Sequence, residues 1–298
     1  MDNKPSISAV VIAYHGMQFI PDCLATLKED IKDFPHEIIV VDNASTDGTV
    51  EFIQENHPDI RLITNDTNTG FAPAVNQGIK ACRFDYIWLL NQDIRIRPGC
   101  LAALLQCHAR LDRPGIIGPR LVGFDGQLQK FCRRLPRIHH MVYKVFGLPL
   151  LFPKSRVFNG WKMGDFDHLS SRPVLQPMGA AMLLHRSCID DIGLMDESFV
   201  IFMNDVDYCE RLIEAGYTNY YCYDAVIEHY QGGSTKRHKP KMIWLSHMGL
   251  YAYFRKVENK RPSKIIKFLR RPLLWVSGLA LVLYATPRSL YHYLRKFI

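Results

Sequence analysis

The sequence predicts an α/β fold in which a mostly parallel sheet is flanked by helices. Over the first part of the chain, short apolar segments alternate with segments of helical spacing. Clusters of polar residues follow the apolar segments, at the strand ends where sheets of this kind bind ligands. Hydrophobic residues make up 48% of the 298 residues and charged residues 22%, which is ordinary globular composition and excludes disordered and collagen-like chains.

Four apolar segments are expected to form strands, because each is a run of Ile, Val, Leu or aromatic residues bounded by polar ones. These segments are residues 7–14, 37–41, 60–64 and 85–90. The segments between them carry apolar residues at helical spacing and are expected to form helices. They are residues 18–32, 46–56 and 72–82. Strands that alternate with helices favour a parallel sheet covered on both faces.

The middle of the chain is less regular. Residues 123–172 are rich in Gly, Pro, His and basic side chains. We interpret them as a long excursion over the face of the sheet that carries the polar clusters. Regular structure is expected to return at residues 176–184 and 199–215.

The net charge of +8 is distributed unevenly along the chain. Residues 236–298 contain 15 Lys and Arg and one acidic residue, a net charge of +14, whereas the first 235 residues carry −6. This asymmetry indicates a polyanionic partner, either nucleic acid or an anionic membrane surface. We favour the membrane and expect no nucleic-acid partner, because nucleic-acid binding would leave the motifs of the acidic part unexplained.

The basic tail also contains apolar segments. Residues 273–286 carry no charge, but 14 residues are too few to cross a bilayer, which takes about 20. Residues 290–298 place their apolar side chains on one helical face beside Arg295 and Lys296. Such a pattern is typical of helices that lie in a membrane interface. The alternatives are helices that pack on the domain, or a contact between two copies of the chain in a homo-oligomer.

The start of the chain and its cysteines indicate a cytoplasmic location. The chain reaches its first apolar segment without the apolar region or cleavage site of a signal peptide. The eight cysteines form no C-x-x-C pair, so we expect reduced thiols in the core and no structural zinc. With the basic tail, this predicts a peripheral protein on the inner face of the cell membrane.

Two strand ends carry residues suited to a charged ligand. Asp42 ends the second expected strand, where its carboxylate can accept hydrogen bonds from a base or a ribose, while nearby Ser45 can help to cap the next helix. Asn91, Gln92 and Asp93 follow the fourth strand. A carboxylate there is a natural ligand for a divalent cation that also holds phosphates. For either motif taken alone, an ordinary turn is the competing interpretation.

Two later segments carry candidate catalytic groups. Asp205 lies at an expected helix start, where the helix dipole alone would stabilise an acid. Its functional interpretation is a general base that takes a proton from an attacking hydroxyl. His229 precedes a Gly-Gly pair and is a candidate second metal ligand, although a lone His is more often structural.

The order of these motifs resembles glycosyltransferase family 2, whose members are nucleotide-sugar-dependent transferases with the GT-A fold, and within it the rhamnosyltransferase-like branch. The resemblance spans about residues 6–235. Its motifs, in chain order, are Ala13-Tyr14-His15, Val40 to Thr49, Asn68 to Gly78, Asn91-Gln92-Asp93, Met178 to Leu184, Gly193 to Phe199, Asn204 to Asp207, and His229. Three residues depart from the family pattern: His15 and Asn204 stand where Asn and Glu are usual, and Asn91 replaces the first acid of the metal motif.

The resemblance implies a role for each matching residue. Residues implied in nucleotide-sugar binding are Ala13, Tyr14, Asp42, Asn43, Ser45, Asn68, Gly70, Asn76, Asn91, Gln92 and Asp93. Residues implied on the acceptor side are Gly179, Ala180, Asn204 and Asp207. Asp205 is implied as the general base, and Asp93 with His229 as the ligands of Mg²⁺ or Mn²⁺.

The resemblance also implies the reaction, which is an inverting, metal-dependent transfer of a hexose. The expected donor is dTDP-rhamnose, and the expected acceptor is a hydroxyl of a lipid-linked saccharide in cell-surface polysaccharide biosynthesis. Residues 1–235 would form the transferase domain, with a nucleotide-binding half (1–122) and an acceptor-side half (123–235), followed by the basic helical region 236–298. The alternatives are a UDP- or GDP-hexose donor, or a catalytically silent membrane scaffold. A processive synthase is disfavoured because no Gln-x-x-Arg-Trp motif follows the base.

Overall fold

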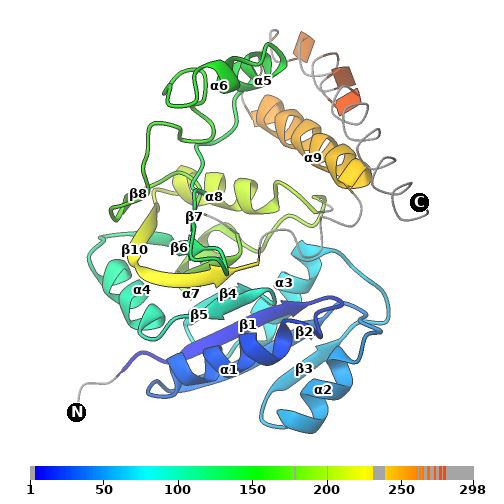
Figure 1. Ribbon diagram of the computed structural model, residues 1–298, viewed down its shortest axis with the longest axis vertical. Helices are drawn as coiled ribbons and strands as arrows, with labels where there is room; N and C mark the ends of the chain where they lie inside the picture. The colour runs from blue at the N-terminus through cyan, green and yellow to red at the C-terminus, as the bar shows by residue number, and fades with distance from the viewer. Residues whose placement is uncertain are drawn as a thin grey trace. The chain divides into compact units, whose positions relative to one another are not determined.

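The computed structural model divides the chain into two compact units (Figure 1). It describes residues 4–177, 179–199, 201–230 and 239–260, with isolated positions between 262 and 279. The first unit comprises residues 1–135, 166–197 and 205–231, and the second comprises residues 136–165, 198–204 and 232–298.

The N-terminal half of the first unit has the predicted alternation of strands and helices. Its elements are β1 (Ile7–Ala13), α1 (Ile20–Ile31), β2 (His36–Asp42), α2 (Thr49–Asn56), β3 (Arg61–Thr64), α3 (Phe71–Ala81) and β4 (Tyr86–Asn91). The four strands pair in parallel in the order β3-β2-β1-β4. All seven residues of β1 are buried, which explains why this strand is a continuous apolar run in the sequence. The four strands and three helices expected here are confirmed.

Beyond β4 the sheet is mixed. The elements that follow in the first unit are β5 (Ile94–Ile96), α4 (Cys100–Ala109), β6 (Pro114–Val122), β7 (Leu128–Gln129), β8 (Arg172–Pro173), β9 (Ala181–His185), α7 (Arg186–Ile192), α8 (Asn204–Glu214) and β10 (Thr218–His229). The main path of the sheet runs β3-β2-β1-β4-β9-β6-β10-β5. β9 is antiparallel to both β4 and β6, and β5 is antiparallel to β10. The expected parallel arrangement therefore holds for β1 to β4 and for the β6–β10 pair, and β5 and β9 are antiparallel to their neighbours.

The sheet is covered by helices on both faces, as the alternation predicted. Along β1, Ala9 and Val11 pack into one apolar cluster with α1 and α4, whereas Val10 and Ile12 pack into a second cluster with α3, α7 and α8. Gly78 allows α3 to approach β1 closely, because a Cβ atom there would lie 2.3 Å from Val10 Cγ1. This close approach is the physical reason for a glycine at the end of the Asn68 to Gly78 motif.

The prediction of reduced cysteines is wrong for one pair. Cys107 of α4 and Cys222 of β10 form a disulfide, although 115 positions separate them in the chain. The other six cysteines are free and buried, as expected of thiols that fill the core.

The second unit contains two helices that were not predicted and one in the region that was predicted to be helical. α5 (Ile138–Val145) and α6 (Leu148–Leu151) lie in the segment that we expected to be irregular. α9 (Lys239–Lys260) forms the first part of the basic tail and buries Leu250, Tyr253, Phe254 and Val257, which lie on one helical face. Among the helices that the described residues form, none is long and apolar enough to cross a bilayer. The expected helix at 290–298, and most of the apolar run at 273–286, lie outside the described residues.

Candidate active site

The ends of three parallel strands meet at one edge of the sheet. In the register of the sheet, Ala13 of β1 lies beside Asp42 of β2, and Ile12 lies beside Asn91 of β4. Asn43 N donates to Ala13 O at 2.8 Å, so the loops after β1 and β2 start in contact. Ala13 and Asp42 are buried, while Tyr14 is exposed at the surface. The polar clusters that the sequence placed at strand ends are thus brought together.

Asp42 has a half-satisfied carboxylate. Its Oδ2 accepts a hydrogen bond from Ser45 N at 2.8 Å. Its Oδ1 is buried and has no hydrogen-bond partner among the described residues. Buried acceptors are rarely left without a partner, because they lose their hydrogen bonds to water and gain none in the protein. The open oxygen of Asp42 is therefore suited to a donor group on a ligand.

The loops after β1 and β2 are tied together by side chains. Ser45 Oγ accepts from His15 N at 2.8 Å, and Asp47 Oδ2 accepts from Met17 N at 3.0 Å. His15 adopts φ of +46° and Ala44 φ of +68°, both in the left-handed region. Asn tolerates this region best after Gly, which gives a physical reason for the Asn that is usual at the position of His15.

Two residues expected to bind the nucleotide-sugar, Asn43 and Asn76, use their side-chain amides for hydrogen bonds within the protein. Asn43 Nδ2 donates to Asn68 Oδ1 at 3.0 Å and to Gly70 O at 3.1 Å, so it shapes the loop after β3. Asn76 is 2% exposed. Its Nδ2 donates to Met195 O at 2.9 Å and its Oδ1 accepts from Met195 N at 3.0 Å. In the structure, Asn76 therefore holds the chain around residue 195.

Gln92 also has a supporting position. Its Oε1 accepts from Tyr14 N and its Nε2 donates to Tyr14 O, both at 2.8 Å. These two bonds hold the loop after β1 against the loop after β4. The backbone at Tyr14 and the start of the metal motif are thereby held in a fixed relation.

Asp93 and His229 lie side by side, as predicted for a pair of metal ligands. His229 Nε2 is 3.7 Å from Asp93 Oδ1, and both side chains are largely buried. The antiparallel pairing of β5 and β10 brings them together, because His229 lies opposite Ile94. Tyr230 N donates to Asp93 O at 2.9 Å, which closes this end of the two strands.

Gln129, which the sequence did not indicate as a site residue, orients His229. Its Oε1 lies 3.1 Å from His229 Nδ1, and its Nε2 donates to His229 O at 2.9 Å. With Nδ1–H donated to Gln129, the lone pair of Nε2 faces Asp93. Burial lowers the pKa of His229, which favours the neutral imidazole that a metal needs. A separation of 100 residues leaves no local signal for this contact.

The donor set fits a divalent cation held jointly by protein and phosphate. Among the described residues no group of three or more His, Cys, Asp or Glu side chains is arranged to hold a metal. One carboxylate and one imidazole leave the remaining positions for phosphate oxygens and water, which is how Mg²⁺ and Mn²⁺ sites on nucleotides are commonly completed. Burial raises the pKa of Asp93, which a bound cation would reverse.

Asp205, the predicted base, lies in the first turn of α8 against Gln176 and Gly179. Gln176 Nε2 donates to Asp205 Oδ2 at 2.9 Å. A Cβ atom at Gly179 would lie 3.2 Å from the same oxygen, so glycine leaves the space that Asp205 occupies. Burial raises the pKa of Asp205, and the Gln176 hydrogen bond opposes that rise. Gln176 was not singled out in the sequence, because it belongs to no motif.

The base segment is connected to the metal motif through β9. Asn91 N donates to Ala180 O at 2.9 Å, and Gly179 beside Ala180 packs against Asp205. Asp205 is therefore joined to the segment that carries Asp93 by a short series of contacts. This series of contacts connects the Asp205 carboxylate with the segment that carries the Asp93 carboxylate.

Two of the residues expected on the acceptor side, Asp207 and Asn204, are buried in the structure. Asp207 is 2% exposed, and its Oδ2 accepts from Arg211 Nε at 3.0 Å. Arg211 also donates to Ile192 O and Leu194 O. Through Arg211, Asp207 thus supports the turn after α7. Asn204 begins α8 and is buried.

Known proteins share this fold. A mannosyltransferase from Pyrobaculum calidifontis, PcManGT, solved with GDP-Man and Mn²⁺, matches 97% of this chain and 76% of its own with a TM-score of 0.58 at 18% identity. TarS residues 1–349 from S. aureus match 95% of this chain and 82% of their own with a TM-score of 0.51 at 15% identity. These likenesses show the fold, a GT-A-like mixed α/β architecture.

The sequence comparison agrees with the fold. An N-acetylglucosaminyl-diphospho-decaprenol L-rhamnosyltransferase from Mycobacterium tuberculosis is 28% identical over 231 residues, which cover 74% of each chain. The family model described as glycosyl transferase family 2 matches residues 8–166, more than half of the chain and the whole span from β1 through the metal motif. The chain therefore belongs to glycosyl transferase family 2.

Proposed function

We propose that the protein is an inverting glycosyltransferase that moves L-rhamnose from dTDP-rhamnose to a hydroxyl of a lipid-linked saccharide in cell-surface polysaccharide biosynthesis. The observation that carries this proposal is the grouping of Asp205 with the Asp93–His229 pair through the β4–β9 contact. The donor and acceptor are suggested by the relative from M. tuberculosis, whose name specifies an L-rhamnosyltransferase and a diphospho-decaprenol-linked sugar.

In the proposed complex the nucleoside lies over the ends of β1 and β2. The open Oδ1 of Asp42 accepts a hydrogen bond from the base or the ribose. Gln92 keeps the backbone of Tyr14 in place at the edge of this site. The hydrogen bonds from His15 N to Ser45 Oγ and from Met17 N to Asp47 Oδ2 hold the two loops in one arrangement beside the nucleoside.

Asp93 and His229 would hold Mg²⁺ or Mn²⁺ on the diphosphate, where the bound cation neutralises the charge of the leaving group. Gln129 keeps the His229 ring in the orientation and tautomer that present Nε2 to the site. Asp205 accepts the proton of the acceptor hydroxyl, whose oxygen attacks the anomeric carbon from the face opposite the diphosphate. Because this is one displacement with one base, the configuration at the anomeric carbon is inverted.

The proposed location is the inner face of the cell membrane, where the basic tail holds the protein against anionic lipid. A lipid-linked acceptor would be presented at this surface. Removal of residues 236–298 is expected to release the protein from anionic vesicles, and unchanged vesicle binding would contradict that role of the tail.

The mechanism is tested with Asp205→Asn. This substitution keeps the shape and the Gln176 contact but removes the proton acceptor, so calorimetry should find dTDP-rhamnose binding unchanged while transfer falls by about three orders of magnitude or more. Transfer at the wild-type rate would rule out Asp205 as the base. The donor is tested by calorimetry with dTDP-rhamnose, UDP-glucose, UDP-N-acetylglucosamine, UDP-galactose and GDP-mannose, each with and without Mn²⁺. Selective, Mn²⁺-dependent binding of a UDP- or GDP-sugar would replace the proposed donor.

A further inference from the structure

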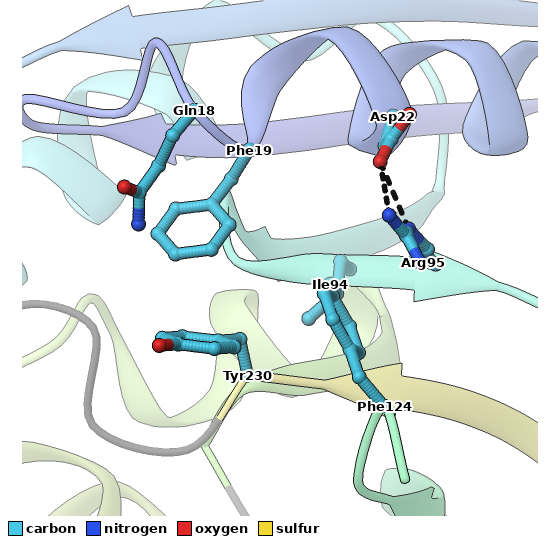
Figure 2. A pocket seen from close by; sticks show the side chains of 7 residues that line it. All are labelled: Gln18, Phe19, Asp22, Ile94, Arg95, Phe124 and Tyr230. Atoms are coloured by element: carbon cyan, nitrogen blue, oxygen red, sulfur yellow. Dashed lines mark hydrogen bonds and ion pairs between the residues drawn. The ribbon is translucent and has the colours of Figure 1, made fainter. Parts of the chain in front are cut away.

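A cavity in the first unit is lined in part by Ile94 and Tyr230, which directly follow Asp93 and His229 in the chain (Figure 2). Its volume is about 290 Å³, at the lower end of the range of small-molecule sites. The residues that line it come from the start of α1, from β5, from the loop after β6 and from the end of β10. They are Gln18, Phe19, Asp22, Ile94, Arg95, Phe124 and Tyr230.

Three aromatic rings form the apolar part of this cavity. The Phe19 and Tyr230 ring centroids lie 5.0 Å apart, and those of Phe124 and Tyr230 lie 5.7 Å apart. Figure 2 shows Phe19 on the α1 side, Tyr230 at the opposite wall, and Phe124 beside Ile94. Phe124 and Tyr230 each remain 39% exposed, so each keeps surface that a ligand can contact. An aromatic ring presents a flat apolar surface with a negative face, which attracts polarised C–H groups.

The rim of the cavity is polar. Arg95 Nε donates to Asp22 Oδ2 at 2.9 Å, and the Arg95 guanidinium lies 4.4 Å from the centre of the Phe124 ring. The side chains of Arg95 and Asp22 remain 43% and 55% exposed, so both have capacity for further hydrogen bonds. Figure 2 shows the Gln18 amide at the other end of the cavity. An apolar aromatic wall with hydrogen-bonding groups around it matches a pyranose ring, which has apolar C–H faces and a rim of hydroxyls.

The cavity shares its wall with the candidate metal ligands. Ile94 directly follows Asp93, Tyr230 directly follows His229, and Tyr230 N donates to Asp93 O at 2.9 Å. A sugar ring in this cavity would therefore lie next to the diphosphate end of the donor site. We infer that the cavity is a saccharide subsite that holds a sugar ring of the acceptor by stacking on Phe124 and Tyr230. This inference rests on the proposed function, because it assumes a saccharide acceptor.

The test measures saccharide binding separately from donor binding. Saturation-transfer NMR with N-acetylglucosamine, L-rhamnose and galactose is expected to show saturable binding of at least one sugar to the whole chain. Phe124→Ala should weaken this binding about tenfold, because it removes one stacking surface. Gln18→Ala, at an exposed position, should weaken it without any risk to folding.

Tyr223→Ala is the matched control, because Tyr223 also lies under an arginine, Arg120, but outside the cavity. Equal weakening by Tyr223→Ala and Phe124→Ala, or no saturable binding to the wild type, would overturn the subsite. Calorimetry of dTDP with Mn²⁺ in the same samples tests the proposed function alone. If the wild type does not bind dTDP, the result counts against the transferase mechanism. If the wild type binds dTDP but no sugar, the result counts against the subsite.

An independent observation in the second unit concerns the segment 146–157, which we call the apolar loop. Five of its large apolar side chains are exposed, with fractions of 49% to 85%. They are Phe146, Leu150, Leu151, Phe152 and Val157. Clusters of exposed large apolar residues in one short segment are unusual in soluble proteins and mark interaction surfaces.

The charge around the apolar loop identifies its partner. Residues 136–164 contain five Lys and Arg and no Asp or Glu. Lys154 and Arg156 are exposed within the loop itself. Exposed apolar side chains with cations beside them are suited to the boundary between acyl chains and anionic headgroups. We infer that the apolar loop inserts into an anionic lipid surface, which goes beyond the basic tail considered above.

Vesicle sedimentation of the full chain tests this inference. Vesicles of phosphatidylglycerol and phosphatidylethanolamine are expected to bind the wild type, and the double substitution Leu150→Glu and Leu151→Glu should reduce the partition coefficient at least tenfold. The control is Leu169→Glu, at a position that is 58% exposed but outside the apolar loop. Equal sedimentation of the double variant and the wild type would overturn the loop's role and leave the tail as the anchor. No binding by the wild type would overturn both.

Discussion

The substitution Asn76→Ala separates the supporting role of this residue from a role in donor binding. Asn76 Nδ2 donates to Met195 O at 2.9 Å and to Glu197 Oε1 at 2.8 Å, and its Oδ1 accepts from Met195 N at 3.0 Å. Each buried hydrogen bond contributes about 1 kcal/mol net, so the three together contribute about 3 kcal/mol. Alanine is the better helix former within α3 and returns about 0.5 kcal/mol. The expected loss is about 2.5 kcal/mol in the free energy of unfolding.

This loss is measured by urea denaturation and by thermal melting. In a domain of this size each kcal/mol lowers the Tm by about 2 to 4 °C, so a decrease of about 5 to 10 °C is expected. The control is Asn56→Ala, which removes an exposed helical amide that bonds only Phe52 O. It should change the unfolding free energy by less than about 0.5 kcal/mol. An Asn76→Ala protein of unchanged stability that no longer binds dTDP would refute the reasoning and restore the donor contact.

Three further predictions concern the site. Gln176→Leu removes the hydrogen bond that lowers the pKa of Asp205, so the Asp205 carboxylate becomes protonated at a higher pH. The acid limb of the pH–rate profile is therefore expected to move to higher pH. The pH dependence of dTDP binding should not change. Gln129→Leu frees the His229 ring and should weaken Mn²⁺ affinity about 10- to 100-fold in calorimetric titrations with dTDP present. Gly179→Ala pushes a methyl group against Asp205 and should lower kcat at least tenfold with donor affinity kept.

Each of these has a control outcome. Gln127→Leu, at an exposed glutamine directly before the strand β7 that contains Gln129, should leave Mn²⁺ affinity as in the wild type. An unmoved acid limb in Gln176→Leu would mean that Asp205 is not the group whose protonation limits the rate. Full activity of Gly179→Ala would show that the space beside Asp205 is not needed for the acceptor hydroxyl.

Much of the first half of the fold is readable from the sequence, because its signals are local. β1 is buried along its whole length and therefore reads as an unbroken apolar run, and α1 shows its stripe of Leu24, Leu27 and Ile31. β6 was missed because Pro119 and Gly118 interrupt its pattern, which is tolerated only where the surrounding sheet compensates. The antiparallel insertion of β9 between β4 and β6 left no trace in periodicity.

The candidate site shows the same division. The positions of Asp42, Asp93, Asp205 and His229 followed from motifs at the ends of strands and at a helix start, where elementary rules of chain geometry place them. The contacts of Asn76 with Met195 and Glu197 could not be foreseen, because a motif names a residue but does not say where its amide donors point. Gln129 and Gln176 belong to no motif, and their roles follow only from contacts across 100 and 29 positions.

The sequence by itself therefore determined the alternation of strands and helices, the strand ends that carry the chemistry, and the basic character of the tail. Only the tertiary structure decided which polar side chains bond to other protein groups and which keep an unpaired atom for a ligand. It also decided the Cys107–Cys222 disulfide and the aromatic cavity lined by Ile94, which follows Asp93. The physical reason is that periodicity reports how a segment buries its own face, whereas hydrogen-bond partners and cavity walls come from segments that only the folded sheet brings together.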